Sequence, residues 1–212
     1  MMKRVPKPLQ LPSSAWSDDA NQKVRAIGNK EQRLAKRLQD GEKTAAREFY
    51  ALYANRLAGV CSRYITDEED LKDVFQDAFV HIISHIQDFQ YRGAGSLQVW
   101  ATKVVVSRSL KFLQTKNRLK LVPLDLDRVD VAEDDEPPIS DIPPDIVHQL
   151  VSRLPTGYRT VLNLYVFEGH SHQGIARLLG ITVNASTSQL HRAKRLLSRM
   201  IQQYNDNKEL RQ

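Results

Sequence analysis

Apolar residues recur every three or four positions through two long parts of the chain, about residues 31–120 and 146–204, and this spacing is typical of helices. In the first part the pattern predicts helices over residues 31–60, 68–89 and 97–117. The first helix, broken at Asp40-Gly41, is expected to bury Leu34, Leu38, Ala45, Phe49, Leu52, Tyr53, Leu57 and Val60. Ser96 is expected to cap the third helix. Because no pattern of paired strands is present, the predicted fold is all-α.

The second part predicts four helices with recognisable starts and ends. Pro155 fits the first turn of the second of them, and Ser171 can cap a short third helix. Gly180 permits the left-handed backbone of a tight turn, and Thr182 can cap the long basic helix that follows. Two capped helices on either side of a glycine turn predict a helix-turn-helix.

Helical periodicity stops between Leu121 and Asp145. This segment holds five of the nine prolines, nine acidic residues and one basic residue, so it predicts an extended linker. The expected organisation is therefore two small helical domains, residues 31–120 and 146–204, joined by an acidic, Pro-rich linker, residues 121–145. The ends are predicted to be a poorly ordered arm, residues 1–30, and a short tail, residues 205–212.

The formal net charge of +6 is distributed unevenly. The linker carries −8, so the rest of the chain carries +14. A strongly basic chain favours a polyanion as partner, because neutralised phosphates supply most of the non-specific affinity for nucleic acid. A basic soluble protein with a solvated linker explains the same charges, and charge alone leaves both interpretations open.

Composition excludes several other classes of protein. The single cysteine, Cys61, excludes a disulfide framework and a cysteine-rich zinc site, and it suits a reducing compartment. No stretch approaches the roughly 18 apolar residues of a membrane span, and the first residues lack the pattern of a secretory signal. We therefore expect a cytoplasmic protein without direct membrane insertion.

In a helix-turn-helix, the N-terminal half of the second helix enters the major groove. The polar side chains expected to be exposed there, within reach of base edges or phosphates, are Asn184, Ser186, Thr187 and Gln189. The basic side chains that follow, which suit phosphates, are His191, Arg192, Lys194, Arg195 and Arg199. The alternative is an amphipathic helical hairpin with a solvated basic face, and the glycine turn between two caps favours DNA binding.

The first predicted domain carries its charges on separate segments. Residues 67–88 contain seven acidic residues and one basic residue, whereas residues 91–120 contain seven basic residues and no acidic one. An acidic helix repels phosphates, so we expect it to face a protein, while the basic segment can follow nucleic acid. Tyr91, in a glycine-flanked loop, is the better candidate for stacking on an unpaired base, and helical spacing favours a core position for Trp100.

Three segments in a fixed order resemble one protein family. They are the acidic helix Asp70–Phe79, the stretch Tyr91–Leu113, and the stretch Leu154–Lys194 with the predicted helix-turn-helix. With an acidic linker between the second and the third, they resemble bacterial RNA polymerase sigma factors of the extracytoplasmic-function (ECF) group of the sigma-70 family. The resemblance covers about residues 31–204.

The resemblance implies a sigma factor that directs promoter-specific initiation, with core RNA polymerase, promoter DNA and an anti-sigma factor as partners. It implies no enzymatic activity, no cofactor and no metal. The residues implied in polymerase binding are Asp70, Asp73, Gln76, Asp77 and Phe79. Those implied in contacts with the −10 element are Tyr91, Arg92, Trp100, Lys103, Ser107, Arg108, Lys111, Lys116 and Arg118. Those implied in contacts with the −35 element are Ser171, His172, Thr182, Asn184, Ser186, Thr187, Gln189, His191, Arg192 and Arg195.

Two other functions compete with this one. A stand-alone helix-turn-helix regulator explains residues 146–204 but gives no role to the acidic helix or the basic aromatic segment. An enzyme acting on nucleic acid would need a reactive centre. His81 and His85 are a candidate pair of metal ligands, but no third ligand, nucleophile or phosphate-binding motif accompanies them. The linker also has two interpretations, a mimic of nucleic acid in the polymerase cleft and a solvated spacer.

Overall fold

The computed structural model describes residues 18–116 and 142–209, with side chains for residues 29–116 and 142–207. All elements in these ranges are helical, which confirms the all-α prediction. The predictions for residues 1–17, for residues 117–141 with Arg118, and for residues 210–212 lie outside the described residues. No helix in the described part of the chain is long and apolar enough to cross a membrane.

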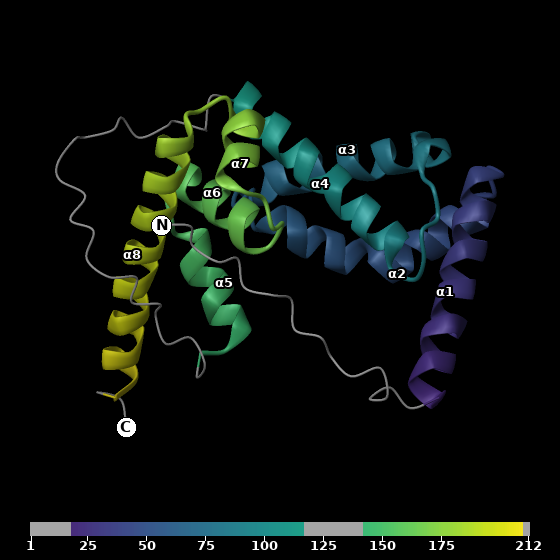
Figure 1. The fold of residues 1–212 in the computed structure, drawn as a ribbon, viewed down its shortest axis with the longest axis horizontal. Helices are drawn as coiled ribbons and strands as arrows, with labels where there is room; N and C mark the ends of the chain where they lie inside the picture. The colour runs from purple at the N-terminus through teal and green to yellow at the C-terminus, as the bar shows by residue number, and fades with distance from the viewer. Residues whose placement is uncertain (1–17, 117–141, 210–212) are drawn as a thin grey trace, which may run out of the picture.

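Residues 18–116 form the first module. Its elements are α1 (Asp18–Gln39), α2 (Lys43–Ser62), α3 (Glu68–Ser84), the short 3-10 helix η1 (Ile86–Asp88) and α4 (Ser96–Thr115). Helix α4 packs against α2 and α3, and α1 crosses the end of this bundle against α2 and η1 (Figure 1). Fully buried side chains such as Phe49, Leu57, Ile82 and Leu97 fill the centre. Each contributes roughly 1.5–3 kcal/mol relative to exposure, so these apolar stripes hold the helices together.

Residues 142–209 form the second module. Its elements are α5 (Pro144–Ser152), α6 (Thr156–Val166), α7 (His172–Leu179) and α8 (Val183–Glu209). Helix α8 packs against α5, α6 and α7 and lies at the opposite end of the molecule from α1 (Figure 1). Leu164, Ile175 and Ile201 are fully buried between these helices. These side chains belong to the same continuous apolar core as the buried side chains of the first module.

The predicted helix-turn-helix is confirmed at its three signal residues. Ser171 caps α7, because its hydroxyl accepts a hydrogen bond from the N–H of Gly174 at 3.2 Å. Thr182 caps α8 in the same way, by accepting from the N–H of Ala185 at 3.1 Å. Gly180 ends α7 with φ of 67°, in the left-handed region that side chains with a Cβ rarely adopt.

Several predicted boundaries are wrong. Helix α1 begins at Asp18, so residues 18–30 belong to a helix and not to a poorly ordered arm. The helix predicted over residues 68–89 ends at Ser84. The hydroxyl of Ser84 donates to the carbonyl of Val80 at 2.8 Å, so a side chain competes there with the backbone N–H for this carbonyl. Helix α8 continues to Glu209, through the first part of the predicted tail.

Two predicted side-chain positions also differ. Leu52 is 63% exposed, whereas Phe49 and Leu57 of the same helix are fully buried, so Leu52 lies outside the face of α2 that packs into the bundle. Ser96 is the first residue of α4 and not its cap. Its hydroxyl accepts a hydrogen bond from the N–H of Arg92 in the preceding loop at 3.2 Å.

The two modules meet at the C-terminal end of α2. Arg159 of α6 donates from Nη2 to the carbonyl of Tyr64 at 3.0 Å, and Asn163 donates from Nδ2 to the carbonyl of Arg63 at 2.7 Å. The guanidinium of Arg63 lies 4.4 Å from the centre of the Phe167 ring. Arg159 and Asn163 are buried in this arrangement, and burial lowers the pKa of Arg159.

Two further contacts join the modules at exposed positions. Gln114, near the end of α4, donates from Nε2 to the carbonyl of Leu178 in α7 at 3.2 Å. Ser62 Oγ lies 3.4 Å from His148 Nε2. These two contacts are polar and exposed, so water can replace them, whereas the apolar core beneath them is shared by both modules.

Candidate functional site

One exposed face of α3 is acidic. Asp73, Gln76 and Asp77 are exposed at helical spacing, and Val80 follows on the same face with 60% exposure. Asp70, nearer the start of the helix, is half-buried. Acidic residues in this first turn are favourable because the N-terminus of a helix carries partial positive charge.

An aromatic cluster lies beside this acidic face. Phe79 is half-buried, with its ring centre 5.9 Å from that of Phe49 and 5.2 Å from that of Tyr50. Tyr50 itself is 52% exposed, and the sequence prediction did not include it, because it directly follows the buried Phe49 and has no charge or motif that marks a surface site. We call the exposed set the α2–α3 surface; its residues are Tyr50, Asp73, Gln76, Asp77 and Val80. Exposed apolar and acidic groups side by side are suited to a basic protein partner.

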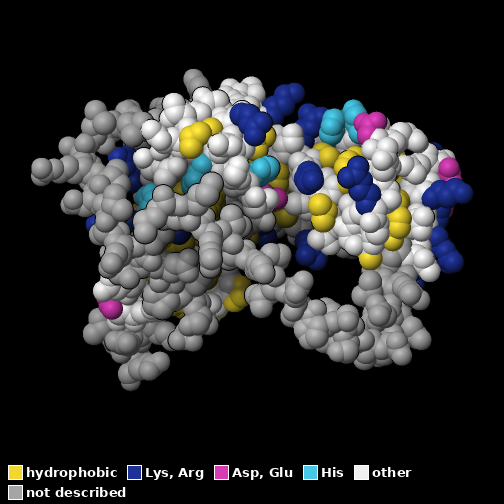
Figure 2. Space-filling view, in the orientation of Figure 1, with side chains coloured by type: hydrophobic (Ala, Val, Ile, Leu, Met, Phe, Trp, Pro, Cys, Tyr) yellow, Lys and Arg dark blue, Asp and Glu magenta, His cyan; other side chains and the backbone are white. Residues whose placement is uncertain are grey.

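The outer face of α4 is basic. Lys103, Ser107 and Lys111 are exposed at steps of four residues and lie on one face of the helix. Trp100 continues this face toward the N-terminus of α4, half-buried, with its ring 5.6 Å from that of Phe89. Figure 2 shows Lys and Arg side chains on the visible face of the first module, over the part where α4 runs in Figure 1. The structure thus brings four of the predicted −10 residues together.

Arg108 does not lie with them. Its Nη1 is 3.5 Å from Asp77 Oδ2, and its Nη2 contacts Nδ1 of His81, so its guanidinium lies between α3 and α4. Burial and the Arg108 cation lower the pKa of His81, which favours the neutral ring as hydrogen-bond acceptor. The rings of His81 and His85 are 3.8 Å apart, but no group of three or more candidate metal ligands occurs among the described residues.

The loop before α4 carries the other −10 candidates. Tyr91 is half-buried and packs against the core, whereas Arg92 is exposed. Gly93 and Gly95 have φ of 122° and 85°, so the loop uses backbone conformations that favour glycine. Lys116 is exposed one residue beyond the end of α4. This loop leads directly into α4, so its residues lie next to the N-terminal end of the outer face of that helix.

The outer face of α8 contains fewer residues than predicted. Asn184, His191 and Arg195 are exposed on one face, with Thr187 half-buried and bonded to the carbonyl of Val183 in its own helix. Thr182 is exposed beside them at the turn, and Arg192 is half-buried. Ser188, which the prediction omitted, is half-buried and falls on the face of Asn184 and His191 by helical spacing.

The prediction that Ser186 and Gln189 are exposed is wrong. Ser186 is fully buried and Gln189 is 6% exposed, because these positions of α8 face α6 and α7. The hydroxyl of Ser186 lies 3.0 Å from Nδ1 of His172, whose ring stacks on that of Tyr165 at 4.9 Å. His172 therefore joins three helices, and Ser171 serves as the cap of α7.

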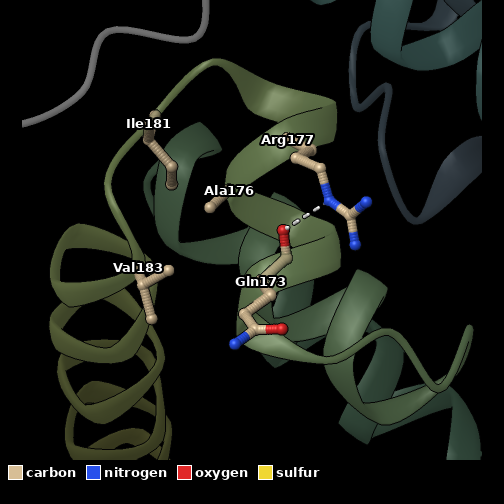
Figure 3. Close-up of a pocket in the computed structure, with 5 residues that line it drawn as sticks. All are labelled: Gln173, Ala176, Arg177, Ile181 and Val183. Carbon is tan, nitrogen blue, oxygen red and sulfur yellow. Dashed lines mark hydrogen bonds between the residues drawn. The ribbon is translucent and has the colours of Figure 1, made fainter.

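An open pocket lies between α7 and the turn that leads into α8 (Figure 3). Ala176, Ile181 and Val183 supply its apolar lining, while Gln173 and Arg177 supply its polar part. Arg177 is exposed and donates from Nε to the carbonyl of Gln173 at 3.4 Å. It is a cation beside the turn of the helix-turn-helix that the sequence prediction did not include.

Two family descriptions match the chain, one in each module. Sigma-70 region 2 matches residues 49–119, and sigma-70 region 4 matches residues 145–197. The two matches together span more than half of the chain, in the order of the two modules. Helix α1 lies entirely before the first match.

Proteins of known function are similar over most of the chain. The ECF RNA polymerase sigma-E factor of Haemophilus influenzae is 26% identical over 183 residues, which cover 81% of this chain and 95% of that protein. The RNA polymerase sigma-H factor of Pseudomonas aeruginosa is 25% identical over 186 residues, covering 81% and 94%. The solved structure of CnrH in complex with the cytosolic domain of CnrY is 24% identical, covers 80% of this chain and 95% of that chain, and gives a TM-score of 0.42. From the region 2 and region 4 matches and these relatives, the chain belongs to the sigma-70 family of RNA polymerase sigma factors, in its ECF group.

Proposed function

We propose that this protein binds core RNA polymerase and directs it to promoters by reading a −35 element as duplex and a −10 element as melted DNA. The observation that carries the proposal is the match of sigma-70 regions 2 and 4 to two modules with distinct charged surfaces. The proposed role is binding without covalent chemistry, in the cytoplasm where polymerase and chromosome are found. A stand-alone DNA-binding regulator gives no role to the α2–α3 surface and is not favoured.

Each surface has a proposed partner. The α2–α3 surface docks on core polymerase, because its exposed acids repel DNA and its apolar side chains suit a protein. The outer face of α4 and the preceding loop meet the −10 region, where Tyr91 and Ser107 receive an unstacked base. The outer face of α8 enters the major groove of the −35 element. An anti-sigma factor that competes for these surfaces completes the set of proposed partners.

Promoter binding in this proposal requires the modules to separate. The two elements lie 25 positions apart by their names, which is about 85 Å along B-DNA at roughly 3.4 Å per base pair. Helix α4 is only about 30 Å long, and its end contacts α7 through Gln114 and Leu178. The closed arrangement therefore cannot place both modules on their elements. A chain of 25 residues, the length of the segment 117–141, can span at most about 83–90 Å, which allows the opening.

Purified components test the proposal directly. The chain is expected to co-elute with core polymerase in gel filtration and to produce defined run-off transcripts from genomic DNA. Core polymerase alone provides the baseline. A chain that binds DNA but neither co-elutes with core polymerase nor yields such transcripts would be a regulator, and the proposed function would be wrong.

Replacing Asn184 by Ala is expected to weaken binding to −35 duplex DNA about tenfold, because a polar side chain at the start of a recognition helix contributes ~1–3 kcal/mol at a base edge. Fluorescence anisotropy of the holoenzyme on a labelled −35 duplex measures the change. The matched control is Gln202→Ala, an exposed amide on the same helix but near its other end. Equal loss in both variants would show that Asn184 has no specific contact with DNA.

A further inference from the structure

A buried carboxylate of α1 holds the start of α4. Glu31 is 5% exposed, and it accepts three hydrogen bonds from backbone amides 64 to 67 residues further along the chain. Its Oε2 accepts from Gly95 at 2.5 Å, and its Oε1 accepts from Leu97 at 2.8 Å and from Gln98 at 3.3 Å. Hydrogen bonds to an ionised acceptor are roughly twice as strong as neutral ones, so this contact fixes the backbone of the segment.

Helix α4 has no cap of its own. Gly95 occupies the N-cap position and has no side chain, and the first turn of α4 contains no acidic residue. A capping side chain ordinarily satisfies the second and third N–H groups of a helix, which here belong to Leu97 and Gln98. Glu31 binds both of them and places a negative charge at the positive end of the helix dipole. The cap that the sequence leaves out of α4 is thus supplied by α1.

Helix α1 also holds the other end of the loop. Gln39, about two turns beyond Glu31, donates from Nε2 to the carbonyls of Ile86 at 3.2 Å and Phe89 at 3.0 Å. The segment from η1 to the first turn of α4 is therefore attached to α1 at both ends. Tyr91 lies between the two attachments, so α1 determines where this ring stands relative to the outer face of α4.

We propose that Glu31 is a positioning residue for −10 recognition, which it serves by fixing the loop of residues 90–95 and the first turn of α4 in the geometry that receives an unstacked base. The inference rests on the proposed function, because it assigns this loop to the −10 element. The proposal assigns a role in promoter recognition to α1, a helix that lies outside the region 2 match, residues 49–119. Glu31 is buried and acts through the backbone of the loop rather than by touching DNA.

Glu31→Gln tests the proposal with little change of shape, because it removes the charge and one of the two acceptor oxygens. The probe is fork-junction DNA with an unpaired −10 strand, taken from a start site mapped by run-off transcription. Affinity of the variant holoenzyme for this probe is expected to fall about tenfold, a loss comparable with that of one stacked base. Affinity for core polymerase is expected to stay unchanged, and hydrogen exchange at the amides of Leu97 and Gln98 is expected to rise.

A second variant separates positioning from loss of stability. Gln98→Glu places a carboxylate in the first turn of α4, which stabilises the helix terminus locally but gives the loop no attachment to α1. The double variant Glu31→Gln/Gln98→Glu is therefore expected to regain most of the melting temperature that Glu31→Gln loses, but not the lost affinity for the −10 probe. If the affinity returns together with the stability, Glu31 acts only on stability and the proposal is overturned.

The control is Glu42→Gln, the same chemical change at a carboxylate of the same module that is 42% exposed and bonded to Arg37. It is expected to bind the −10 probe like the unchanged protein. Unchanged −10 affinity in the Glu31→Gln holoenzyme would overturn the positioning role and leave the proposed function intact. Failure of the unchanged protein to bind core polymerase would overturn the proposed function itself, so the two failures are distinguishable.

Discussion

Cross-linking the two modules in their closed arrangement is expected to reduce promoter-dependent transcription to the level of core polymerase alone. The variant Ser62→Cys/His148→Cys places two thiols where the native side chains are 3.4 Å apart across the interface. A short, reducible, thiol-specific cross-linker then prevents the separation that the spacing of the promoter elements requires. Native Cys61 stays in place, because it is fully buried and burial raises the pKa of its thiol, which slows its reaction.

Run-off transcription before and after reduction measures this effect, and reduction is expected to restore the transcripts. The control cross-link joins Arg37→Cys and Glu48→Cys, whose native side chains are 2.6 Å apart within the first module, and it is expected to leave transcription intact. Full transcription by the cross-linked Ser62→Cys/His148→Cys protein would show that the closed arrangement already fits the promoter. The argument from element spacing would then be wrong.

Reversing the charge of Asp73 is expected to weaken binding of core polymerase by about tenfold or more, equivalent to ~1.4 kcal/mol or more. Asp73→Lys changes an exposed position of the α2–α3 surface and places a like charge against the basic partner that the acidic face favours. Binding of the second module to −35 DNA is not expected to change. Fluorescence anisotropy of the labelled chain titrated with core polymerase, at two salt concentrations, measures the affinity and its screening.

The matched control for this charge reversal is Asp206→Lys, which makes the same change at an exposed position near the end of α8. It alters the net charge equally but leaves the α2–α3 surface intact, so its affinity for core polymerase is expected to equal that of the unchanged protein. If both variants bind core polymerase as tightly as the unchanged protein does, α3 is not the docking helix. If both lose affinity equally, net charge rather than this surface governs the encounter.

Local sequence signals predicted the helix-turn-helix well because its geometry depends on neighbouring residues. Ser171 and Thr182 bind amides three residues away, and Gly180 supplies a backbone conformation that is a property of glycine itself. Local signals do not predict the burial of Ser186 and Gln189. Polar residues on an amphipathic helix are ordinarily exposed, whereas α6 and α7 cover this part of α8 and His172 provides a partner for Ser186.

Boundaries and surface sets were less predictable because they depend on contacts between distant segments. Arg108 looks like one more base of the −10 segment, yet Asp77 and His81 bind it across the gap between α3 and α4. Tyr50 directly follows Phe49 of the core stripe, yet it lies outside the bundle, where its ring contacts Phe79 and extends the acidic face of α3. In both cases the deciding contact is with another helix, which spacing along one helix cannot reveal.

The sequence by itself determined the all-α class, the order of the two modules, the separation of acidic and basic segments, and the turn of the helix-turn-helix. All of these follow from local propensity, from periodicity and from charge, which neighbouring residues carry. Only the tertiary structure decided that Glu31 caps α4 and that Arg159 and Asn163 hold the two modules together. Such contacts join backbone groups to side chains far along the chain, and they form only after packing has brought the helices within hydrogen-bonding distance.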